Sequence, residues 1–443
     1  MPRFPGAHLI LISVDTLRRD AVGIYSGRPL ASPAIDRLAR EGIVFADAVA
    51  ASNNTGPSHA SMLTGVSAAV HGVLNAKSTP PRLIPSSLPT MAERLREAGY
   101  ATVGRADAGY VTPVFGFQRG FDDFKSEYTG LFRKLPETLA FFEKHAASKP
   151  VFAFLHTYEV HSPYLSMPQR AAAAMNGFED TEVARRVHSL VEDHVADRLS
   201  EGQFRLFDNW KAKFTSRDFE ALKVLYAECV KTADSRIGAF VEDLRRRGIL
   251  DQCVLVVTSD HGEEFGEHGS VQHEECWEEL LRVPLIVRLP RGVLAGKRVR
   301  APISGVDLMP TLLDLLGMPV PTGIEGRSAV PAILRETVLD PVTYAHHTSQ
   351  DMMIGTVART PQWKVYDFDN RPQWARAFHL AKDPAERENL SKSPPPEAQE
   401  LLQTLKARRD VWRAMGALHD SGRSTGVMDQ ELLDQLDSLG YTR

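Results

Sequence analysis

Continuous apolar runs alternate with amphipathic segments over the first two thirds of this chain. Strands buried on both faces are expected at four such runs, residues 9–14, 151–155, 254–258 and 285–289. Apolar residues recur at helical spacing between these runs, notably in Leu88–Ala98 and Tyr226–Arg247. Buried strands that alternate with long helices predict an α/β domain, with a central mostly parallel sheet flanked by helices.

The pattern changes near residue 329 and divides the chain into two expected units. Residues 1–328 form the catalytic domain in this interpretation, with a charged helical insertion near 167–217. Residues 329–443 contain shorter strand-like pieces, a proline-rich break and a helical segment at 397–412. This second part is predicted to be a smaller C-terminal α+β subdomain with a tail.

Composition and charge limit the classes of partner and the compartment. The formal net charge is −4 and no basic run is present, so a nucleic-acid partner is not expected. Three cysteines without metal-ligand spacing indicate free thiols in a reducing compartment. Neither a signal-peptide pattern nor a membrane-spanning apolar stretch is seen, so a cytoplasmic protein without a membrane partner is expected. The oligomeric state stays open.

Two carboxylates follow the first and third of the predicted strands. Asp15 and Asp260 therefore lie at the carboxyl ends of strands, where sites form in parallel sheets. His261 follows directly, and Gly262 permits a sharp turn that lets both neighbours reach one cation. The alternative is structural: each aspartate caps the helix after it and His261 lies on the surface.

A polar run meets a short helical segment at residues 54–65. Pro57 lies where the first helical position is expected and Gly65 lies just past the end, which are start and stop signals of a helix. Thr55 would then lie at the positive end of the helix, where unpaired backbone N–H groups favour an anion. Thr55 could equally be a simple helix cap.

Residues 54–65 also resemble the nucleophile signature of sulfatases, Cys-x-Pro-Ser-Arg-x-x-x-Leu-Thr-Gly. Thr55 stands in the place of the modified cysteine, and His59 stands in the place of the arginine. Other segments similar to this family follow in order along nearly the whole chain: 13–20, 65–73, 154–164, 259–269, 273–284, 306–313, 378–384 and 436–441. The chain thus resembles the sulfatase family of the alkaline phosphatase superfamily, which implies an alkaline phosphatase-like core.

The resemblance implies a metal site made of Asp15, Thr55, Asp260 and His261. Thr16 stands where sulfatases usually have a second aspartate, and His261 stands where many have asparagine. Imidazole suits manganese and zinc, whereas cages of oxygen ligands suit calcium. One divalent metal is therefore expected, Mn²⁺ or Zn²⁺ rather than Ca²⁺.

Further roles around the bound ester are implied by the same resemblance. His59 and His273 replace an arginine and a lysine, which lowers the fixed positive charge unless these imidazoles are protonated. His161 or His273 would protonate the leaving group. Asn75 and the helix N-terminus would hold the non-bridging oxygens.

Two more histidines, His156 and His268, are candidate substrate-site residues with open roles. Either would be a hydrogen-bond partner behind the site or part of a second metal site. A two-metal relative usually shows Asp-x-x-x-His, but Thr157 lies four residues before His161. A single metal is therefore preferred.

Three functions remain after these observations. The first is a metal-dependent hydrolase of phosphate or phosphonate esters and diesters, with Thr55 as nucleophile and a covalent phospho-threonine intermediate. The second is a sulfuric ester hydrolase that works without formylglycine, since none of the three cysteines lies near Thr55. The third is a catalytically silent relative that binds an anion. In each case the partner is a small anionic molecule.

Overall fold

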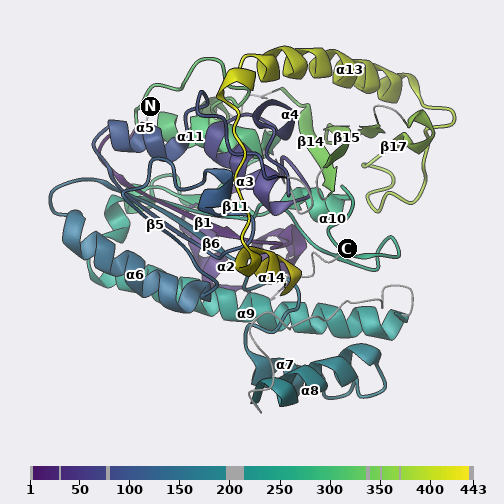
Figure 1. The fold of residues 1–443 in the computed structure, drawn as a ribbon, viewed down its shortest axis with the longest axis horizontal. Coiled ribbons are helices and arrows are strands. Elements are labelled where there is room, and N and C mark those ends of the chain that lie inside the picture. The colour runs from purple at the N-terminus through teal and green to yellow at the C-terminus, as the bar shows by residue number, and fades with distance from the viewer. Residues whose placement is uncertain are drawn as a thin grey trace.

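The computed structural model describes residues 3–28, 31–75, 80–195, 214–335, 340–349, 352–368 and 371–438. An eight-stranded sheet crosses its centre (Figure 1). β11 runs antiparallel to both of its neighbours, and all other neighbouring pairs are parallel, which confirms the predicted mostly parallel sheet. In spatial order the strands are β12 (Lys297–Val299), β2 (Ile43–Phe45), β11 (Leu285–Arg288), β7 (Cys253–Thr258), β1 (His8–Val14), β6 (Val151–Thr157), β4 (Ala101–Ala106) and β5 (Asp123–Ser126).

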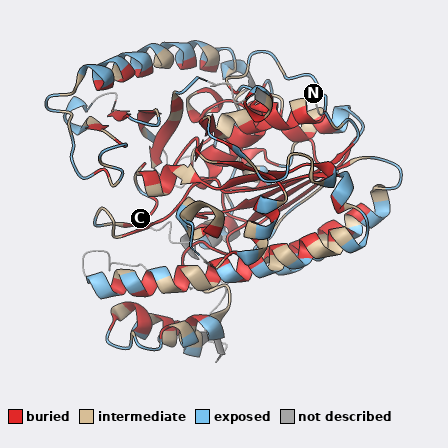
Figure 2. Cartoon of the chain, turned by 180° about the vertical axis from the view of Figure 1, so that it is seen from behind, coloured by how far each residue is buried: buried red, intermediate tan, exposed pale blue. Residues whose placement is uncertain are grey.

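The central strands are largely apolar because the side chains of each strand belong to two hydrophobic cores, one on each face of the sheet. In β1, Leu9 and Leu11 belong to one core, while Ile10 and Ile12 belong to the other. Successive side chains of a strand point to opposite faces, so a strand covered on both sides needs apolar residues at every position. Figure 2 shows the sheet as an almost continuous buried layer between helices.

Helices cover both faces of this sheet (Figure 1). One core contains α2 (Pro33–Arg40), α6 (Gly130–His145), α7 (Pro168–Ala174), α8 (Glu182–Val195) and α9 (Ser216–Arg246). The other contains α3 (Thr55–Thr64), α4 (Ala68–His71), α5 (Met91–Glu97), α11 (Leu308–Leu315) and α12 (Val330–Arg335). No helix within the described ranges is long and apolar enough to cross a bilayer.

The predicted insertion at 167–217 is helical where it is described. α7 and α8 lie within it, while residues 196–213 fall outside the described part. α9 begins at Ser216, ten residues earlier than the periodic pattern indicated. Thr215 explains this start: its hydroxyl accepts a hydrogen bond from the backbone N–H of Asp218, whose carboxylate accepts one in return from the Thr215 N–H.

The C-terminal part contains a second sheet and a long helix, as expected for an α+β unit. Its four antiparallel strands are β14 (Thr343–Ser349), β15 (Met352–Arg359), β16 (Lys364–Asp367) and β17 (Arg376–Phe378). α13 (Pro396–Ala417) exceeds the predicted 397–412 at both ends, and α14 (Gln430–Ser438) follows. The boundary at 328/329 stays a prediction, and the end of the family-like segment 436–441 lies outside the described residues.

Short elements connect these layers. They are α1 (Gly23–Ser26), α10 (Glu278–Leu281), β3 (Ala48–Val49), β8 (Glu264–Phe265), β9 (Val271–Gln272), β10 (Arg282–Val283) and β13 (Ile303–Ser304). A buried ion network joins α10 to the second sheet: Arg359 Nη2 lies 2.8 Å and Lys364 Nζ 3.3 Å from carboxylate oxygens of Glu278. Buried charges need such partners, so this network holds the C-terminal sheet against the catalytic part.

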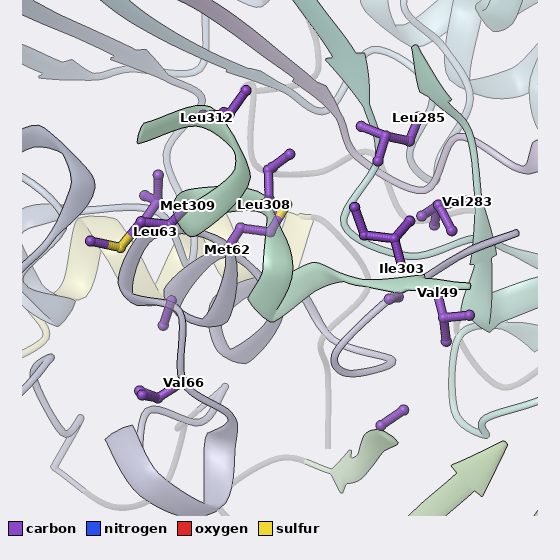
Figure 3. Close-up of a cluster of buried hydrophobic side chains, with 14 of the residues drawn as sticks. Val49, Met62, Leu63, Val66, Val283, Leu285, Ile303, Leu308, Met309 and Leu312 are labelled. Carbon is purple, nitrogen blue, oxygen red and sulfur yellow. The ribbon is translucent and has the colours of Figure 1, made fainter. Parts of the chain in front are cut away.

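α3 packs against α11 through apolar side chains. Met62 and Leu63 point from α3 toward Leu308 and Met309 of α11, as Figure 3 shows. Every residue of α3 is buried. Burial of such side chains contributes about 1.5–3 kcal/mol each, so the position of the C-terminal turn of α3, which carries Met62 and Leu63, is strongly determined.

Candidate active site

Asp15 and Asp260 meet at the carboxyl edge of the central sheet. β1 and β7 are parallel neighbours, with Ser13 paired to Thr258, and each aspartate follows two residues later. The backbone N–H of Thr16 donates to Asp260 Oδ1 at 3.3 Å, and both aspartates are fully buried. The predicted meeting of two carboxylates on one rim is confirmed.

The two turns that carry these aspartates have different causes. Thr16 adopts a left-handed conformation, φ 55°, which is uncommon for a β-branched residue and typical of functional turns. Gly262 is needed for space and not for a positive φ, which corrects the sequence interpretation. A Cβ at Gly262 would lie 1.9 Å from the carbonyl oxygen of Glu279. The backbone of Gly262 is held at this close approach because its N–H donates to the carbonyl oxygen of Leu280.

Thr55 is the first residue of α3, so Pro57 occupies the third helical position and not the first. Asn54 is extended, and its carbonyl accepts the backbone N–H of Ser58, which starts the helix two residues before the proline. Proline is tolerated throughout the first turn because its missing N–H has no partner there. Gly65 ends the helix in the left-handed conformation, φ 72°, as predicted.

His261 presents Nε2 to the Thr55 hydroxyl. Its Nδ1 lies 3.0 Å from the carbonyl oxygen of Gly262, which can only accept, so in the neutral ring Nδ1 carries the hydrogen. The lone pair of Nε2 then lies 3.4 Å from Thr55 Oγ1 and 3.4 Å from Asp260 Oδ2. A histidine whose second nitrogen donates to a backbone carbonyl is oriented as metal ligands are.

The residues at this edge fit a divalent cation. Asp15 Oδ1 and Asp260 Oδ2 are buried and accept no hydrogen bond from any described residue. Ligand atoms of Asp15, Asp260 and His261 lie within 4.8 Å of one another. Buried carboxylate oxygens without partners are costly unless a cation neutralises them. Two carboxylates and an imidazole, with the Thr55 hydroxyl beside them, are therefore a suitable donor set.

The two aspartates of this cluster differ in their pKa values. Burial, followed by the charge of Asp260, raises the pKa of Asp15 well above its ordinary value. Burial acts in the same direction on Asp260, but His261 and His59 outweigh it and hold the Asp260 pKa below the ordinary range. Two carboxylates that face one another without a cation share one proton more readily than they both ionise.

The metal-free protein should become less stable relative to its Asp15→Asn variant as the pH rises. Because the pKa of Asp15 is raised in the folded state, the stability that protonated Asp15 contributes is fully present below 3.8, the pKa of this group in the unfolded chain. This contribution is lost as the pH rises through the folded value. Asparagine has no such titration. Thermal unfolding in a chelator at pH 4.5 to 7.5 measures the difference, and a constant difference would contradict the prediction.

His59 lies against the first turn of α3 and close to Asp260, whose Oδ2 is 3.5 Å from His59 Nδ1. Its Nδ1 lies 2.8 Å from the carbonyl oxygen of Thr55, and its Nε2 lies 2.9 Å from Ser13 Oγ. Burial lowers the pKa of His59, so the ring is neutral near pH 7. Both nitrogens are engaged by the protein, and His59 thus links the first turn of α3 to β1.

His156 orients Asp15. Its Nε2 lies 3.1 Å from Asp15 Oδ2, and burial, then His59, keeps its pKa well below the ordinary value. Asp15, His59 and His156 form a second group with ligand-like spacing. Because both nitrogens of His59 already have partners, this group fits a second cation less well than the first group fits one.

Asn75 is attached to the start of α3. Its Oδ1 accepts the backbone N–H of Gly56 at 2.9 Å, and its Nδ2 donates to Asn54 Oδ1 at 3.2 Å. An amide nitrogen has two hydrogens, so Asn75 retains one for an ester oxygen. The Gly56 N–H, in contrast, is already used within the protein.

His161 and His273 form a pair beside His261. Their Nε2 atoms lie 3.4 Å apart, and the ring of His273 lies 4.4 Å from that of His261, centroid to centroid. Burial lowers the pKa of His161 to about 4, so this imidazole is neutral near pH 7 unless an anion binds beside it.

His268 is not brought to this cluster. Its ring stacks on Trp277 with centroids 3.9 Å apart, and its Nε2 lies 3.5 Å from Glu279. Its ligand-like neighbours are Glu279 and Glu386. The other predicted residues, Asp15, Thr55, His59, Asn75, His156, Asp260, His261 and the His161–His273 pair, are linked by the contacts above.

Sequence reasoning missed a supporting pair at the end of β4. Asp107 accepts the backbone N–H of Tyr158 at 2.8 Å and pairs with the buried Lys134. The Tyr158 ring lies 4.7 Å from that of His156 and 5.1 Å from that of His161. Asp107 follows its strand as Asp15 does, but the strand sequence Ala-Thr-Val-Gly-Arg-Ala is not a continuous apolar run.

Family comparison agrees with this arrangement. Residues 7–318 match the Sulfatase family, and residues 266–414 match the family described as N-sulphoglucosamine sulphohydrolase, C-terminal. An N-acetylglucosamine-6-O-sulfatase of Bacteroides thetaiotaomicron is 25% identical over 86% of this chain and 82% of its own. An ulvan-active sulfatase of Formosa agariphila is 27% identical over 87% of this chain and 77% of its own.

Solved structures share the fold. A protein in complex with its substrate D-glucosamine-2-N,6-O-disulfate has a TM-score of 0.75 at 22% identity, covering 92% of this chain and 98% of that chain. A phosphonate monoester hydrolase from Silicibacter pomeroyi has a TM-score of 0.69 at 19% identity, covering 95% and 99%. The chain therefore belongs to the sulfatase family, has its alkaline phosphatase-like fold, and is a hydrolase of sulfuric or phosphoric esters.

Proposed function

We propose that this protein hydrolyses phosphate or phosphonate esters, diesters included, with the hydroxyl of Thr55 as nucleophile. The observation that carries the proposal is the position of this hydroxyl. Thr55 Oγ1 lies 3.4 Å from His261 Nε2, at the start of α3 and beside two buried aspartates, each with one carboxylate oxygen that accepts no hydrogen bond from a described residue. A residue that served only as a helix cap would not need an imidazole and two buried aspartates beside its hydroxyl.

The cysteines supply no replacement for Thr55. Cys229, Cys253 and Cys276 are buried, and burial raises the pKa of each thiol, that of Cys229 to about 11. No described contact joins any of them to the candidate metal ligands. A formylglycine nucleophile derived from cysteine is therefore not part of this proposal.

The proposed reaction proceeds in two displacements. When bound by Asp15, Asp260, His261 and Thr55, a divalent metal lowers the pKa of a hydroxyl and polarises an ester oxygen. Thr55 Oγ1 loses its proton to solvent and forms a bond to phosphorus as the bond to the leaving oxygen breaks, which gives phospho-Thr55. A water molecule then attacks phosphorus, releases the phosphate or phosphonate and restores the Thr55 hydroxyl.

Proton transfer falls to the two paired histidines. The leaving oxygen needs a proton, and His161 or His273 would donate it from Nε2. Because the His161 pKa of about 4 applies without substrate, a bound anion must raise it before this ring can act as an acid. Asn75 would donate its second amide hydrogen to a non-bridging oxygen.

Manganese or zinc suits this ligand set better than calcium. His261 contributes a nitrogen, and among the described candidate ligands only two carboxylates are present. Calcium prefers six to eight oxygen ligands, whereas manganese and zinc accept imidazole.

Sulfate ester hydrolysis is the second candidate, because the named relatives are sulfatases. It would use the same Thr55 hydroxyl without formylglycine. A silent relative that only binds an anion is the third possibility, and the unpartnered carboxylate oxygens argue against it, since anion binding alone does not need them.

A comparison of matched nitrophenyl esters tests the proposal. With Mn²⁺ or Zn²⁺, kcat/KM for a nitrophenyl phosphodiester or phosphonate should exceed that for the nitrophenyl sulfate by at least about 100-fold, or 2.7 kcal/mol of transition-state free energy. A better rate on the sulfate would support the second candidate. Absence of turnover with every ester and metal would support the silent relative.

A further inference from the structure

An open cleft of about 520 Å³ lies beside the start of α3 and is not used by the proposed chemistry. Of the described residues that line it, six define its character: Gly72, Leu74, Arg82, Met353, Arg423 and Thr425. Two are cationic, and Met353 and Leu74 supply apolar surface. The cleft thus differs from the metal cluster, whose side chains are acidic or imidazole.

The guanidinium groups of Arg82 and Arg423 both lie beside Gly72. If Gly72 carried a Cβ, this atom would lie 3.6 Å from Arg423 Cζ and 3.7 Å from Arg82 Nη1. Gly72 adopts a left-handed conformation, φ 72°, so glycine is favoured there for the backbone as well. The missing side chain leaves space between two like charges, and an anion in that space would reduce their repulsion.

Hydrogen-bonding capacity in this pair is only partly used. The Arg82 side chain makes no hydrogen bond or ion pair with any described residue. Arg423 donates to the Val70 carbonyl at 3.2 Å and pairs at 3.1 Å with Asp420, which is 63% exposed, while its Nε is buried without a partner. A guanidinium presents five donors, so at least one face of each arginine remains for a ligand.

Both edges of the cleft are attached to residues next to Thr55. Leu74 precedes Asn75, whose Oδ1 holds the Gly56 N–H, and three residues from Gly72 to Asn75 span at most about 11 Å. On the other edge Met353 pairs with Thr348, whose carbonyl accepts from Asn54 Nδ2 at 2.7 Å. The two edges of the cleft are thus linked, through Asn75 and Thr348, to Gly56 and Asn54, the chain neighbours of Thr55.

We propose that this cleft binds a second anionic group on the substrate, a carboxylate, phosphate or sulfate on its non-reacting part, between Arg82 and Arg423. The inference rests on the proposed function for the position of the reacting ester. It adds the substrate class: a molecule with two separated negative groups joined by a short, partly apolar connection. Planar anions accept two hydrogen bonds from a guanidinium, which gives geometric selectivity.

Binding of product-like probes tests this without turnover. The probes are ω-carboxyalkyl phosphonates with two to six methylene groups, each compared with the alkyl phosphonate of equal length by calorimetry in Mn²⁺. For at least one length the carboxylate should tighten binding about tenfold, the effect of one charge-assisted contact. Arg82→Gln should remove most of this gain, and Arg82→Glu should turn it into a loss.

Matched variants separate a specific contact from a general effect. Arg96→Gln removes an exposed arginine of α5 and should leave the gain unchanged. Arg423→Gln should reduce the gain as Arg82→Gln does. If loss of Arg423 disturbs folding, the Arg82 variants still test the proposal, because Arg82 is exposed and its side chain makes no hydrogen bond or ion pair with a described residue. No gain at any length, or equal loss of both probes in Arg82→Gln, would overturn the proposal. A persistent gain in a protein that hydrolyses no ester would instead contradict only the proposed function.

Discussion

Thr55→Ala should lower kcat for a nitrophenyl phosphonate or phosphodiester by at least about 10⁴-fold while the protein stays folded. The change removes the only proposed nucleophile and leaves Asp15, Asp260 and His261 in place. Loss of the Thr55 hydroxyl should lower the free energy of unfolding by less than it raises the activation free energy of hydrolysis. Steady-state kinetics with Mn²⁺, beside a thermal unfolding curve, measures both effects.

A serine variant is the matched control for this prediction. Thr55→Ser keeps the hydroxyl and removes only a methyl group, so most of the activity should remain. Rapid acid quenching of the wild-type reaction should trap a phosphoryl or phosphonyl group on the peptide containing Thr55, and mass spectrometry should locate it. An active Thr55→Ala variant would show that water, and not Thr55, attacks the ester.

Asp260→Asn should abolish both stabilisation by a divalent metal and hydrolysis. In the wild type, Mn²⁺ at 100 times its dissociation constant should stabilise the fold by about 2.7 kcal/mol, because it binds only the folded state. Removal of one buried carboxylate deletes a ligand and also the repulsion that the cation relieves. The variant should therefore unfold at the same temperature with and without Mn²⁺.

A third group of ligand-like side chains, the His268 group, provides the control. His268, Glu279 and Glu386 have similar spacing but lie apart from Thr55. His268→Gln should keep both the stabilisation by Mn²⁺ and the activity. If instead His268→Gln lost the stabilisation and Asp260→Asn kept it, the metal would belong to the His268 group and the site assignment would be wrong.

Much of the site was predictable because its parts are local. A buried strand followed by an aspartate places Asp15 and Asp260 at one edge of a parallel sheet, and the structure confirms it. The helix stop at Gly65 was predictable for the same reason, since a left-handed conformation after a helix favours glycine. Such signals depend on a few residues that are neighbours in the sequence, so they can be recognised before the rest of the fold is known.

Side-chain direction was not predictable. His59 stands where sulfatases have an arginine, but it lies under α3 because one helical turn brings its Nδ1 to the Thr55 carbonyl. His268 follows a glycine-containing turn that directs it toward Trp277. The other nitrogen of His59 lies 2.9 Å from Ser13 Oγ on β1, a contact between segments distant in sequence that periodicity does not encode.

By itself the sequence determined the α/β class, the family resemblance, the metal-ligand candidates and the threonine at the start of α3. Only the tertiary structure decided which histidines surround Thr55, which carboxylate oxygens accept no hydrogen bond from a described residue, and that Arg82 and Arg423 both lie beside Gly72. The physical reason is the range of the interactions. Strands and helices follow from spacing along the chain, whereas a site is set by sheet register and by the packing of loops from opposite ends of the sequence.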